Sequence, residues 1–515
     1  MPPTDIDALS LELRTLVGSD HVQQGALARE YFSRDIFWWP NAPLSAIVVA
    51  PGQIAEVAAI VRRATAAGMA VVARGGGMSY SGGYVPSEAN SITLDLRRLN
   101  QIREINIVDQ YVTVEAGTPW IALTDALQGT GLRPMFKPPY SGIYSTVGGA
   151  LSQGTADDMS GILSLEVVLA NGDCVSTGSA VAKDAAPFFR NFGPDLAGLF
   201  IADGGTLGVK TAVTIALEPL ARATGYVSFA YDSFAALMRG MVACGQLRLP
   251  GRAMGLDPRK SQNAPRVGFK DAITTLANVA ISKGSVGGGL LDAMKMAAAG
   301  RNFMEGVQWS MHVTAEGVSE RAVEDSLVLL RAAGCREGRE IPNLLPMALA
   351  AKPYSVRGFL GPEGERWVPT NSILPYSCAE KAAAAVQAYF EARRDRMNEL
   401  GIWESYMLGP RPGFVLLEPS FYWSDEVSAL HLDHLDAASA AKFRGRPANP
   451  AAREFALELR HGLVETLQKV GAVHVQMAKT YAYESRLTPE ALRLWSSVKQ
   501  ALDPGNRLNP GNLRR

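Results

Sequence analysis

A glycine-rich segment that follows an apolar run is the stretch best suited to hold an anion. It reads VVARGGGMSYSGGYVP, from Val71 to Pro86. The glycines at 75–77 lack a Cβ, so they can adopt positive φ and let backbone N–H groups converge on one anion. Ser79 and Ser81 can add hydroxyl donors. The pattern favours a loop that cradles a dinucleotide pyrophosphate, although a tight turn that binds nothing is also compatible with it.

Two common nucleotide-binding motifs do not account for this loop. The sequence contains no G-x-x-x-x-G-K-[ST], and the glycine spacing differs from G-x-G-x-x-G, which should open a helix. Soon after Pro86 the chain reads SITLDL, a β-prone run, so the loop is expected between two strands. A Rossmann domain is therefore not expected.

The segment GAVHVQMAKTY, at 471–481, carries polar groups in an alternating pattern. The alternation predicts a strand with His474 and Gln476 on one face. His474 is a candidate base or hydrogen-bond donor, and Lys479 is a candidate to stabilise negative charge. A histidine with a purely structural role explains the pattern nearly as well.

The segment FVLLEPSFYW, at 414–423, places a carboxylate in an apolar run. Strand alternation would put Glu418 on one face with Leu416 and Ser420, opposite Val415, Leu417 and Pro419. Glu418 must there be paired, desolvated with a raised pKa, or at the edge of the segment. Arg411 is the candidate partner, and a structural ion pair competes with a catalytic role. Tyr422 and Trp423 are candidates for an aromatic pocket wall, or for the core.

Short apolar strands and glycine-rich connections must position these groups between Ser45 and about Leu220. One clear helix is predicted at Gln53 to Ala67, where apolar residues recur at helical spacing before a glycine. Beyond residue 221, longer helices such as Ser319 to Ala333 imply a second core. The last forty residues are expected to hold a helix, Glu490 to Leu502, and then an ordered turn. An Ala/Gly-rich stretch at 285–300 is expected as a loop or a loosely packed helix.

Composition indicates a globular protein of two or three domains. The chain has 515 residues, of which 47% are hydrophobic, and its 50 basic residues balance 50 acidic ones. This balance gives no indication of nucleic acid or an anionic membrane as a partner. No segment has the roughly 20 apolar residues of a membrane span, and no secretory pattern opens the chain, so the cytoplasm is the expected location. The four cysteines lack metal-ligand spacing and are expected as buried free thiols.

Four segments together resemble the vanillyl-alcohol oxidase and p-cresol methylhydroxylase (PCMH) superfamily of FAD-linked oxidoreductases. They are RGGGMSYSGG at 74–83, YSTVGGALSQGT at 144–155, PDLAGLFIADGGTLGV at 194–209 and DPGNRLNPGNL at 503–513. The resemblance implies an α+β fold, in which a PCMH-type FAD-binding domain of two α/β subdomains is followed by an α+β substrate (cap) domain with an antiparallel sheet. The implied parts are a helical extension at 1–44, the FAD-binding domain at 45–222, the cap domain at 223–475, and a C-terminal segment at 476–515 that returns to the FAD-binding domain.

The resemblance also implies which residues hold FAD. The two small-residue loops would close on the diphosphate, the third segment and the strand before it would supply adenine-side contacts, and the C-terminal segment would return to the flavin. The implied contacts are Arg74, Gly75, Gly76, Gly77, Met78, Ser79, Tyr80, Ser81, Pro139, Ser145, Thr146, Gly148, Gly149, Gly161, Ile162, Gly208, Val209 and Asn509.

Substrate contacts are expected near the implied flavin. Tyr140, on the proline-stiffened turn KPPYSG, is a candidate to bind a substrate oxygen. Asn371 and Tyr376 lie in a segment that carries a histidine in many relatives, so Asn371 implies altered polarity. The candidate catalytic residues are Tyr140, Glu418, His474, Gln476 and Lys479.

The sequence departs from the superfamily pattern in ways that change the expected chemistry. Met78 stands where many relatives have a histidine bonded to the flavin, so FAD is expected without a covalent bond there. Asp203 places a carboxylate one position from its usual place in SEGTLG. Relatives that attach flavin through the cap domain leave His312, His431 and His434 as outside candidates, with ordinary histidines as the alternative.

The expected reaction is removal of hydride from a small organic alcohol by an FAD-dependent oxidase or dehydrogenase. Tyr140, Tyr422, Trp423 and Tyr481 favour an aromatic or phenolic substrate. The alternatives are an FAD-dependent 2-hydroxy-acid dehydrogenase, although the six histidines form no metal-binding cluster in the sequence, and a flavin-binding module without a redox role. The electron acceptor is left open between oxygen, a cytochrome and a quinone, and a homodimer is left open as well.

Overall fold

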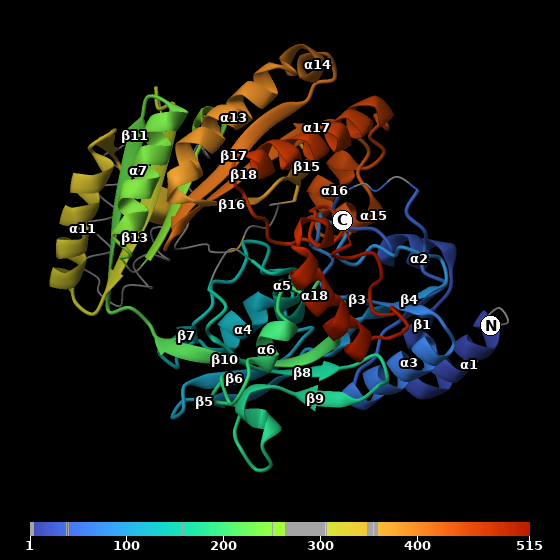
Figure 1. Cartoon of the computed structure of the whole chain (residues 1–515). Coiled ribbons are helices and arrows are strands. Elements are labelled where there is room, and N and C mark those ends of the chain that lie inside the picture. Colours follow the sequence, from blue (N-terminus) through green and yellow to red (C-terminus); the bar gives the residue numbers. More distant parts are fainter. Residues whose placement is uncertain are drawn as a thin grey trace.

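The computed structural model describes residues 5–37, 39, 41–155, 158–249, 251–262, 304, 306–343, 345–347, 354 and 359–514. The described elements form three sheets with helices packed on them (Figure 1). The predicted Ala/Gly-rich stretch at 285–300 lies outside the described residues. The α+β class expected from the sequence is confirmed.

The first sheet has the order β1-β2-β4-β3 and carries the glycine-rich loop at the end of β3. Its strands are β1 (Val22–Gln23), β2 (Ile47–Val49), β4 (Ser91–Asp95) and β3 (Ala70–Arg74). Helices α1 (Ile6–Val17) and α3 (Ile54–Ala66) pack on it. The helix predicted at 53–67 is confirmed. Because β1 pairs with β2, the segment before residue 45 adds a strand as well as helices.

The second sheet is antiparallel and has the order β5-β6-β10-β8-β9, with β7 paired to β10. Its strands are β5 (Ile102–Asn106), β6 (Tyr111–Glu115), β7 (Leu132–Pro134), β8 (Ile162–Val168), β9 (Cys174–Ser176) and β10 (Val209–Pro219). Helices α4 (Trp120–Ala126), α5 (Val147–Gln153) and α6 (Leu196–Leu199) contribute to its core. The second small-residue loop leads into α5.

The third sheet is antiparallel and runs β14-β11-β13-β12-β17-β18-β15, with β16 paired to β18. Its strands are β11 (Ala223–Tyr231), β12 (Gly251–Leu256), β13 (Trp309–Gly317), β14 (Arg339–Ile341), β15 (Arg366–Pro369), β16 (Ser372–Pro375), β17 (Trp403–Arg411) and β18 (Phe414–Trp423). Helices α7 (Phe234–Gln246), α11 (Glu320–Gly334), α13 (Ala379–Glu391) and α17 (Pro450–Lys469) share a core with it. Figure 1 shows these helices on the side of the sheet away from the first two sheets.

Strand β18 confirms the predicted alternation. Val415, Leu417, Phe421 and Trp423 enter the helix-covered core, while Leu416, Glu418, Ser420 and Tyr422 line a cavity on the opposite face. The period of two therefore aims Glu418 away from the helices.

The strand predicted at 471–481 is wrong. Only an isolated bridge joins Val473 to Ile373, and Gln476 and Ala478 have φ of +53° and +39°. These left-handed conformations end any extended ladder, so the alternating pattern of the segment does not set which way its side chains point.

The C-terminal segment returns to the first sheet. Helix α18 (Pro489–Leu502) packs Trp495, Val498 and Leu502 against the core of the second sheet. The chain then pairs with β3, since Val71 N donates to Arg507 O at 2.7 Å and Asn509 N donates to Val71 O at 2.8 Å. The C-terminal turn predicted from the sequence is thus ordered, and an isolated bridge joins it to the edge strand β3.

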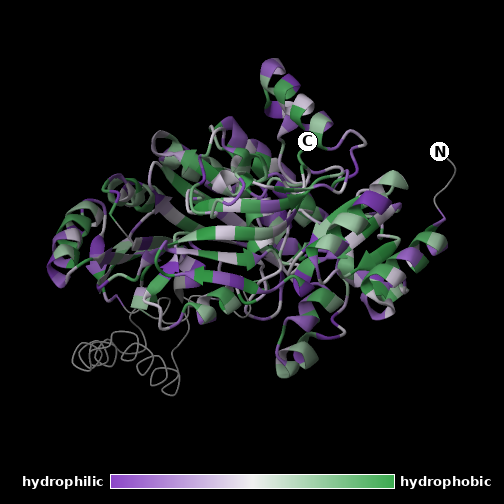
Figure 2. Ribbon diagram, turned by 90° about the horizontal axis from the view of Figure 1, so that it is seen from below, coloured by the Kyte–Doolittle hydropathy of each residue, from purple (hydrophilic) through white to green (hydrophobic). Residues whose placement is uncertain are grey.

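Hydropathy follows the layers: in Figure 2 the inner strands are largely apolar, and the outer helices alternate apolar and polar bands. Among the described helices, none has the length and apolar character needed to cross a bilayer. All four cysteines are free, but Cys174 and Cys335 are exposed, so the expected burial is wrong for these two.

Candidate cofactor and substrate site

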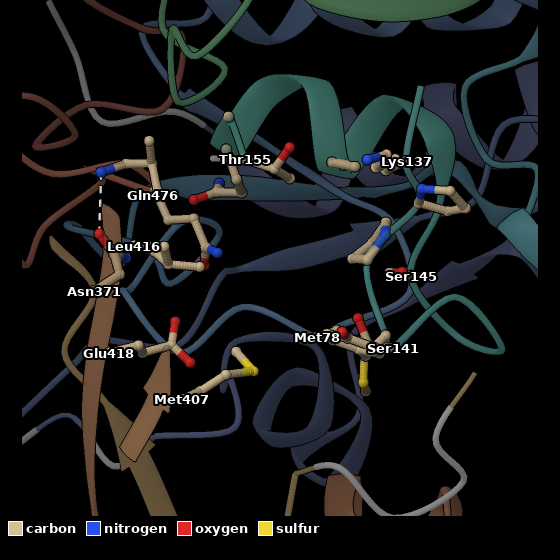
Figure 3. A pocket seen from close by; sticks show the side chains of 18 of the residues that line it. Met78, Lys137, Ser141, Ser145, Thr155, Asn371, Met407, Leu416, Glu418 and Gln476 are labelled. Atoms are coloured by element: carbon tan, nitrogen blue, oxygen red, sulfur yellow. Dashed lines mark hydrogen bonds between the residues drawn. The ribbon is translucent and has the colours of Figure 1, made fainter. Parts of the chain in front are cut away.

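A cavity of about 990 Å³ lies between the glycine-rich loops and the third sheet. It is at the upper end of the volumes usual for ligand sites. Figure 3 places Met78, Ser141 and Ser145 on one side of it and Leu416, Glu418 and Met407 on the other. One continuous space therefore joins the anion-binding loops to the polar face of β18.

The first loop approaches the second so closely that side chains are excluded. A Cβ on Gly76 would lie 1.7 Å from the backbone oxygen of Tyr144, and a Cβ on Gly75 would lie 2.2 Å from Thr146 Oγ1. Thr146 caps α5 by accepting from Gly149 N. The glycines are thus required by contact between the two loops.

Three buried polar atoms in the cavity wall have no hydrogen-bond partner in the protein and could bind a polar ligand. Ser145 Oγ, Thr155 Oγ1 and Asn509 Oδ1 are buried without a protein partner, and all three residues line the cavity. Buried polar atoms are normally paired, so these atoms are available to a bound molecule. Together with the glycine cradle, they fit a dinucleotide that carries a diphosphate.

Glu418 is a buried titratable group of the opposite wall. Burial raises the pKa of its carboxyl to about 7, an effect that the charges of Lys260 and Arg460 partly oppose. Arg411, the expected partner, donates to Pro410 O instead. A carboxyl with a pKa near neutrality can accept and return a proton at physiological pH.

Asn371 and Gln476 bring amide groups to the same wall. Asn371 Oδ1 accepts from Val475 N at 3.0 Å, which holds the segment that carries Gln476 (Figure 3). Asn371 Nδ2 is buried without a protein partner and is free to donate to a ligand. Tyr376 lies outside the cavity wall and bonds to Arg411 O.

Most of the expected contacts converge on the cavity. The residues of the prediction that line it are Arg74, Gly75, Gly76, Gly77, Met78, Ser79, Tyr80, Pro139, Tyr140, Ser145, Thr146, Gly148, Gly149, Gly208, Glu418, Gln476 and Asn509. Their individual roles stay predictions.

His474 and Lys479 lie behind the wall and do not line it. His474 Nδ1 is 2.7 Å from Asn371 O, its ring stacks on Tyr481, and burial lowers its pKa to about 4. Lys479 Nζ donates to Gly82 O and to Asn512 Oδ1, and loss of hydration lowers its pKa to about 7. The catalytic roles expected of both residues stay predictions, which these positions do not favour.

The four remaining residues of the prediction also lie outside the cavity wall. Ser81 is buried and bonds to Gln153. Ile162 and Val209 have their side chains in apolar cores, and a Cβ on Gly161 would meet Met135 O at 2.4 Å. The adenine-side role of Gly161, Ile162 and Val209 and the loop role of Ser81 stay predictions, which the side-chain positions do not favour.

The histidine candidates for flavin attachment are held by other groups. His312 lines the cavity, but its two ring nitrogens lie 2.9 Å from Ser228 Oγ and Ser310 Oγ. Burial lowers its pKa to about 3. His431 and His434 belong to α15 (Ala429–Asp433) and its end, outside the cavity wall.

Sequence reasoning missed several residues of the wall. Lys260, Met254, Met407 and Trp367 line the cavity from α8 (Pro258–Gln262), β12, β17 and β15. Met407 stands opposite Glu418 in the β17–β18 register. No short motif marks these residues, since they converge only when α8 and the strands of the third sheet pack together. The alternation of β17 is the signal that could have suggested Met407.

A protein-family model described as an FAD binding domain matches residues 45–178. This part of the chain is therefore similar to FAD-binding domains. Its match covers both small-residue loops, and the coenzyme that the cradle fits is therefore FAD.

Curated relatives each match less than half of the chain. The glycolate oxidase subunit GlcD of Bacillus subtilis is 34% identical over 184 residues, which are 33% of this chain and 37% of that protein. A D-2-hydroxyglutarate dehydrogenase of Xanthomonas citri pv. viticola is 31% identical over 232 residues, 43% of this chain and 47% of that protein. The matches span less than half the length of these relatives.

Solved structures share the whole fold. p-Cresol methylhydroxylase has a TM-score of 0.71 at 16% identity, covering 98% of this chain and 96% of that one. The 4-ethylphenol oxidase of Gulosibacter chungangensis has a TM-score of 0.71 at 18% identity, covering 99% and 97%. The PCMH-type fold implied by the sequence is thereby confirmed, while the domain boundaries stay predictions. Within the described part of the chain, no group of three or more potential metal ligands occurs.

Proposed function

We propose that the chain is an FAD-dependent oxidoreductase that removes hydride from a small organic alcohol and uses Glu418 as the base. The observation that carries the proposal is the single cavity, which joins the FAD cradle to a buried carboxyl with a pKa of about 7. Bound FAD supplies the hydride acceptor.

The residues of the wall would accept the proton, orient the substrate and exclude water. Glu418 would accept the hydroxyl proton, and the amides of Asn371 and Gln476 would orient the oxygen. Met407, Leu416 and Tyr422 would pack on the substrate carbon skeleton and exclude water. Excluding water strengthens each of these polar interactions.

An aromatic or phenolic alcohol is the substrate class that we propose first. The wall includes Tyr80, Tyr140, Trp367 and Tyr422, which offer ring faces to a planar molecule. The phenol-oxidising proteins share only the fold with this chain, so they support the cavity shape and not the substrate.

A 2-hydroxy acid is a second candidate, favoured by basic residues. The cavity wall includes Lys137, Arg248, Arg252 and Arg411, which would attract a carboxylate. The matched relatives include proteins named for glycolate, D-2-hydroxyglutarate and D-lactate. Oxygen, a cytochrome or a quinone as acceptor, a homodimer and a cytoplasmic location stay open proposals.

The test is anaerobic bleaching of the flavin spectrum in purified protein. Panels of benzylic and phenolic alcohols and of 2-hydroxy acids would be added to the FAD-loaded wild type and to E418Q. We expect bleaching with one panel and a rate lower by about 10²- to 10⁴-fold in E418Q, with the oxidised spectrum unchanged. Oxygen consumption on any active substrate then separates an oxidase from a dehydrogenase.

Two outcomes would contradict the proposal. A flavin that binds but never bleaches would favour a binding module without redox chemistry. Equal bleaching rates in wild type and E418Q would remove Glu418 from the reaction.

A further inference from the structure

The N-terminal segment 31–37 is tied to the glycine-rich loop. Ile36 N donates to Ser79 O at 2.9 Å, and Gly82 N donates to Asp35 Oδ2 at 2.8 Å. Asp35 Oδ1 also accepts from Phe37 N and from the Trp39 indole. The segment therefore fixes the backbone on both sides of Tyr80 and Ser81. We call residues 31–37 the strap.

Arg74 lies beneath the same loop, in an aromatic cage. Its guanidinium carbon is 5.2 Å from the ring centre of Tyr31, 4.8 Å from that of Phe32 and 5.2 Å from that of Tyr84. Two of these rings belong to the strap. Ring faces attract a cation, so the cage holds the charge in place.

The charge of Arg74 has no carboxylate partner within salt-bridge distance among the described residues. The residue is 1% exposed, its Nε and Nη2 lack hydrogen-bond partners, and Nη1 makes a 3.4 Å contact with Gly75 O. An uncompensated buried charge is costly and normally calls for a counter-ion. Arg74 lines the cavity, so a bound anion can supply one.

Arg97 provides a contrast in the same place. Its guanidinium also lies over the Phe32 ring, at 5.4 Å, but it forms a 2.8 Å pair with Asp95 and lies outside the cavity wall. The two arginines thus share an aromatic neighbour and differ in whether the protein neutralises them.

The guanidinium is directly under the turn of the loop. A Cβ on Gly77, whose φ is +78°, would lie 2.6 Å from Arg74 Nη2. Tyr84 Oη donates to Gly77 O at 2.8 Å and closes the cage against the loop. The loop is thus held over a positive charge.

We infer that Arg74 and the strap form one cofactor-sensing unit, in which the diphosphate of FAD supplies the counter-charge of Arg74 and thereby orders residues 31–37. The segment before residue 45 is then part of the FAD site. Without the anion, the unbalanced charge favours opening of the cage. Binding of the diphosphate favours closure.

The test compares R74Q with R97Q, using FAD and ADP as ligands. ADP carries the diphosphate without the flavin ring, whereas riboflavin carries the ring without the diphosphate. We expect R74Q to weaken both FAD and ADP by about tenfold or more and R97Q to weaken them by less than about twofold. Riboflavin affinity should be the same in wild type and R74Q.

Hydrogen exchange gives a second readout, independent of activity. FAD and ADP should each slow exchange of the amides at 31–37 in wild type and in R97Q, but not in R74Q. If R74Q does not fold, F32L serves in its place, because it removes one ring of the cage and keeps an apolar side chain. Affinity for ADP unchanged in the variant tested, or strap exchange unaffected by ADP in wild type, would overturn the inference.

Discussion

At the scale of single residues, the site depends on one carboxyl placed in an apolar wall. Glu418 is buried on β18, opposite Met407, and burial dominates its pKa. Among the described residues, no arginine or lysine forms an ion pair with its carboxylate. The residue is therefore poised between neutral and ionised forms near pH 7.

The pH dependence of turnover follows from this pKa. A base must be ionised to accept a proton, so kcat/KM should rise with pH and level off above an apparent pKa of about 7. In K260M the rise of kcat/KM should move to higher pH, because the lysine charge that lowers the pKa of Glu418 is removed. A rise that keeps its position in K260M, or a flat wild-type profile over this range, would contradict the assignment.

The close contact between the two loops predicts that a side chain at Gly76 weakens FAD binding. In G76A the added Cβ would lie 1.7 Å from Tyr144 O, so the loops must separate. We expect FAD affinity to fall by at least about tenfold, since the diphosphate cradle depends on both loops. G25A is the matched control, because a Cβ there meets nothing within 4 Å. Titration of the apoproteins with FAD would check this, and equal affinities would refute the close approach.

At the scale of elements, a buried ion pair fastens α17 to the end of β18. Asp425 accepts from Arg453 at 2.7 and 2.9 Å, and also from Trp423 Nε1 and the backbone of Asn449. Burial acts to raise the pKa of Asp425, yet the hydrogen bonds hold it below its ordinary value. The cluster thereby fixes α17 against the strand that carries Glu418.

Removal of Arg453 should destabilise the fold, because the carboxylate of Asp425 would stay buried without a counter-ion. R453M leaves the carboxylate of Asp425 buried without its cation, which we expect to lower the free energy of unfolding by about 3–5 kcal/mol. R493M, which breaks the exposed pair of Arg493 with Glu490, should leave the free energy of unfolding almost unchanged. Denaturant melts of both variants test this, and similar midpoints would show that the buried pair adds no more than the exposed one.

At the scale of the whole molecule, one cavity requires all three sheets. The first two sheets supply the loops of the FAD-binding domain, and the third supplies the wall with Glu418. The C-terminal segment closes the assembly, since Asn509 and Asn512 each donate to Gly83 O and Gly204 O. FAD binding and overall stability should therefore be linked.

The linkage predicts a concentration-dependent stabilisation. At a free FAD concentration 100-fold above Kd, the native state gains about 2.7 kcal/mol, so the melting temperature should rise with added FAD. G76A should respond only at higher FAD. A melting temperature indifferent to FAD in the wild type would contradict a site built from the folded chain.

The sequence by itself determined the local features. Glycine runs, hydrophobic periods and turn residues act over a few positions, so the phosphate-cradling loops, the helices at 54–66 and 320–334, the alternation of β18 and the resemblance to FAD-linked proteins could be predicted. Met78 also indicated directly that no histidine is present for a flavin bond at that position.

Only the tertiary structure decided which polar groups face the cavity. The left-handed backbone at Gln476 and Ala478 removed the strand predicted at 471–481, and it left His474 and Lys479 behind the wall. Met407 came to face Glu418 through the pairing of β17 with β18, and Lys260 reached the same cavity from α8. Tyr31 and Phe32 met Arg74 from 42 or more positions away in the chain. Such contacts depend on how separate elements pack, and the short-range pattern that forms each element carries no information about its distant neighbour.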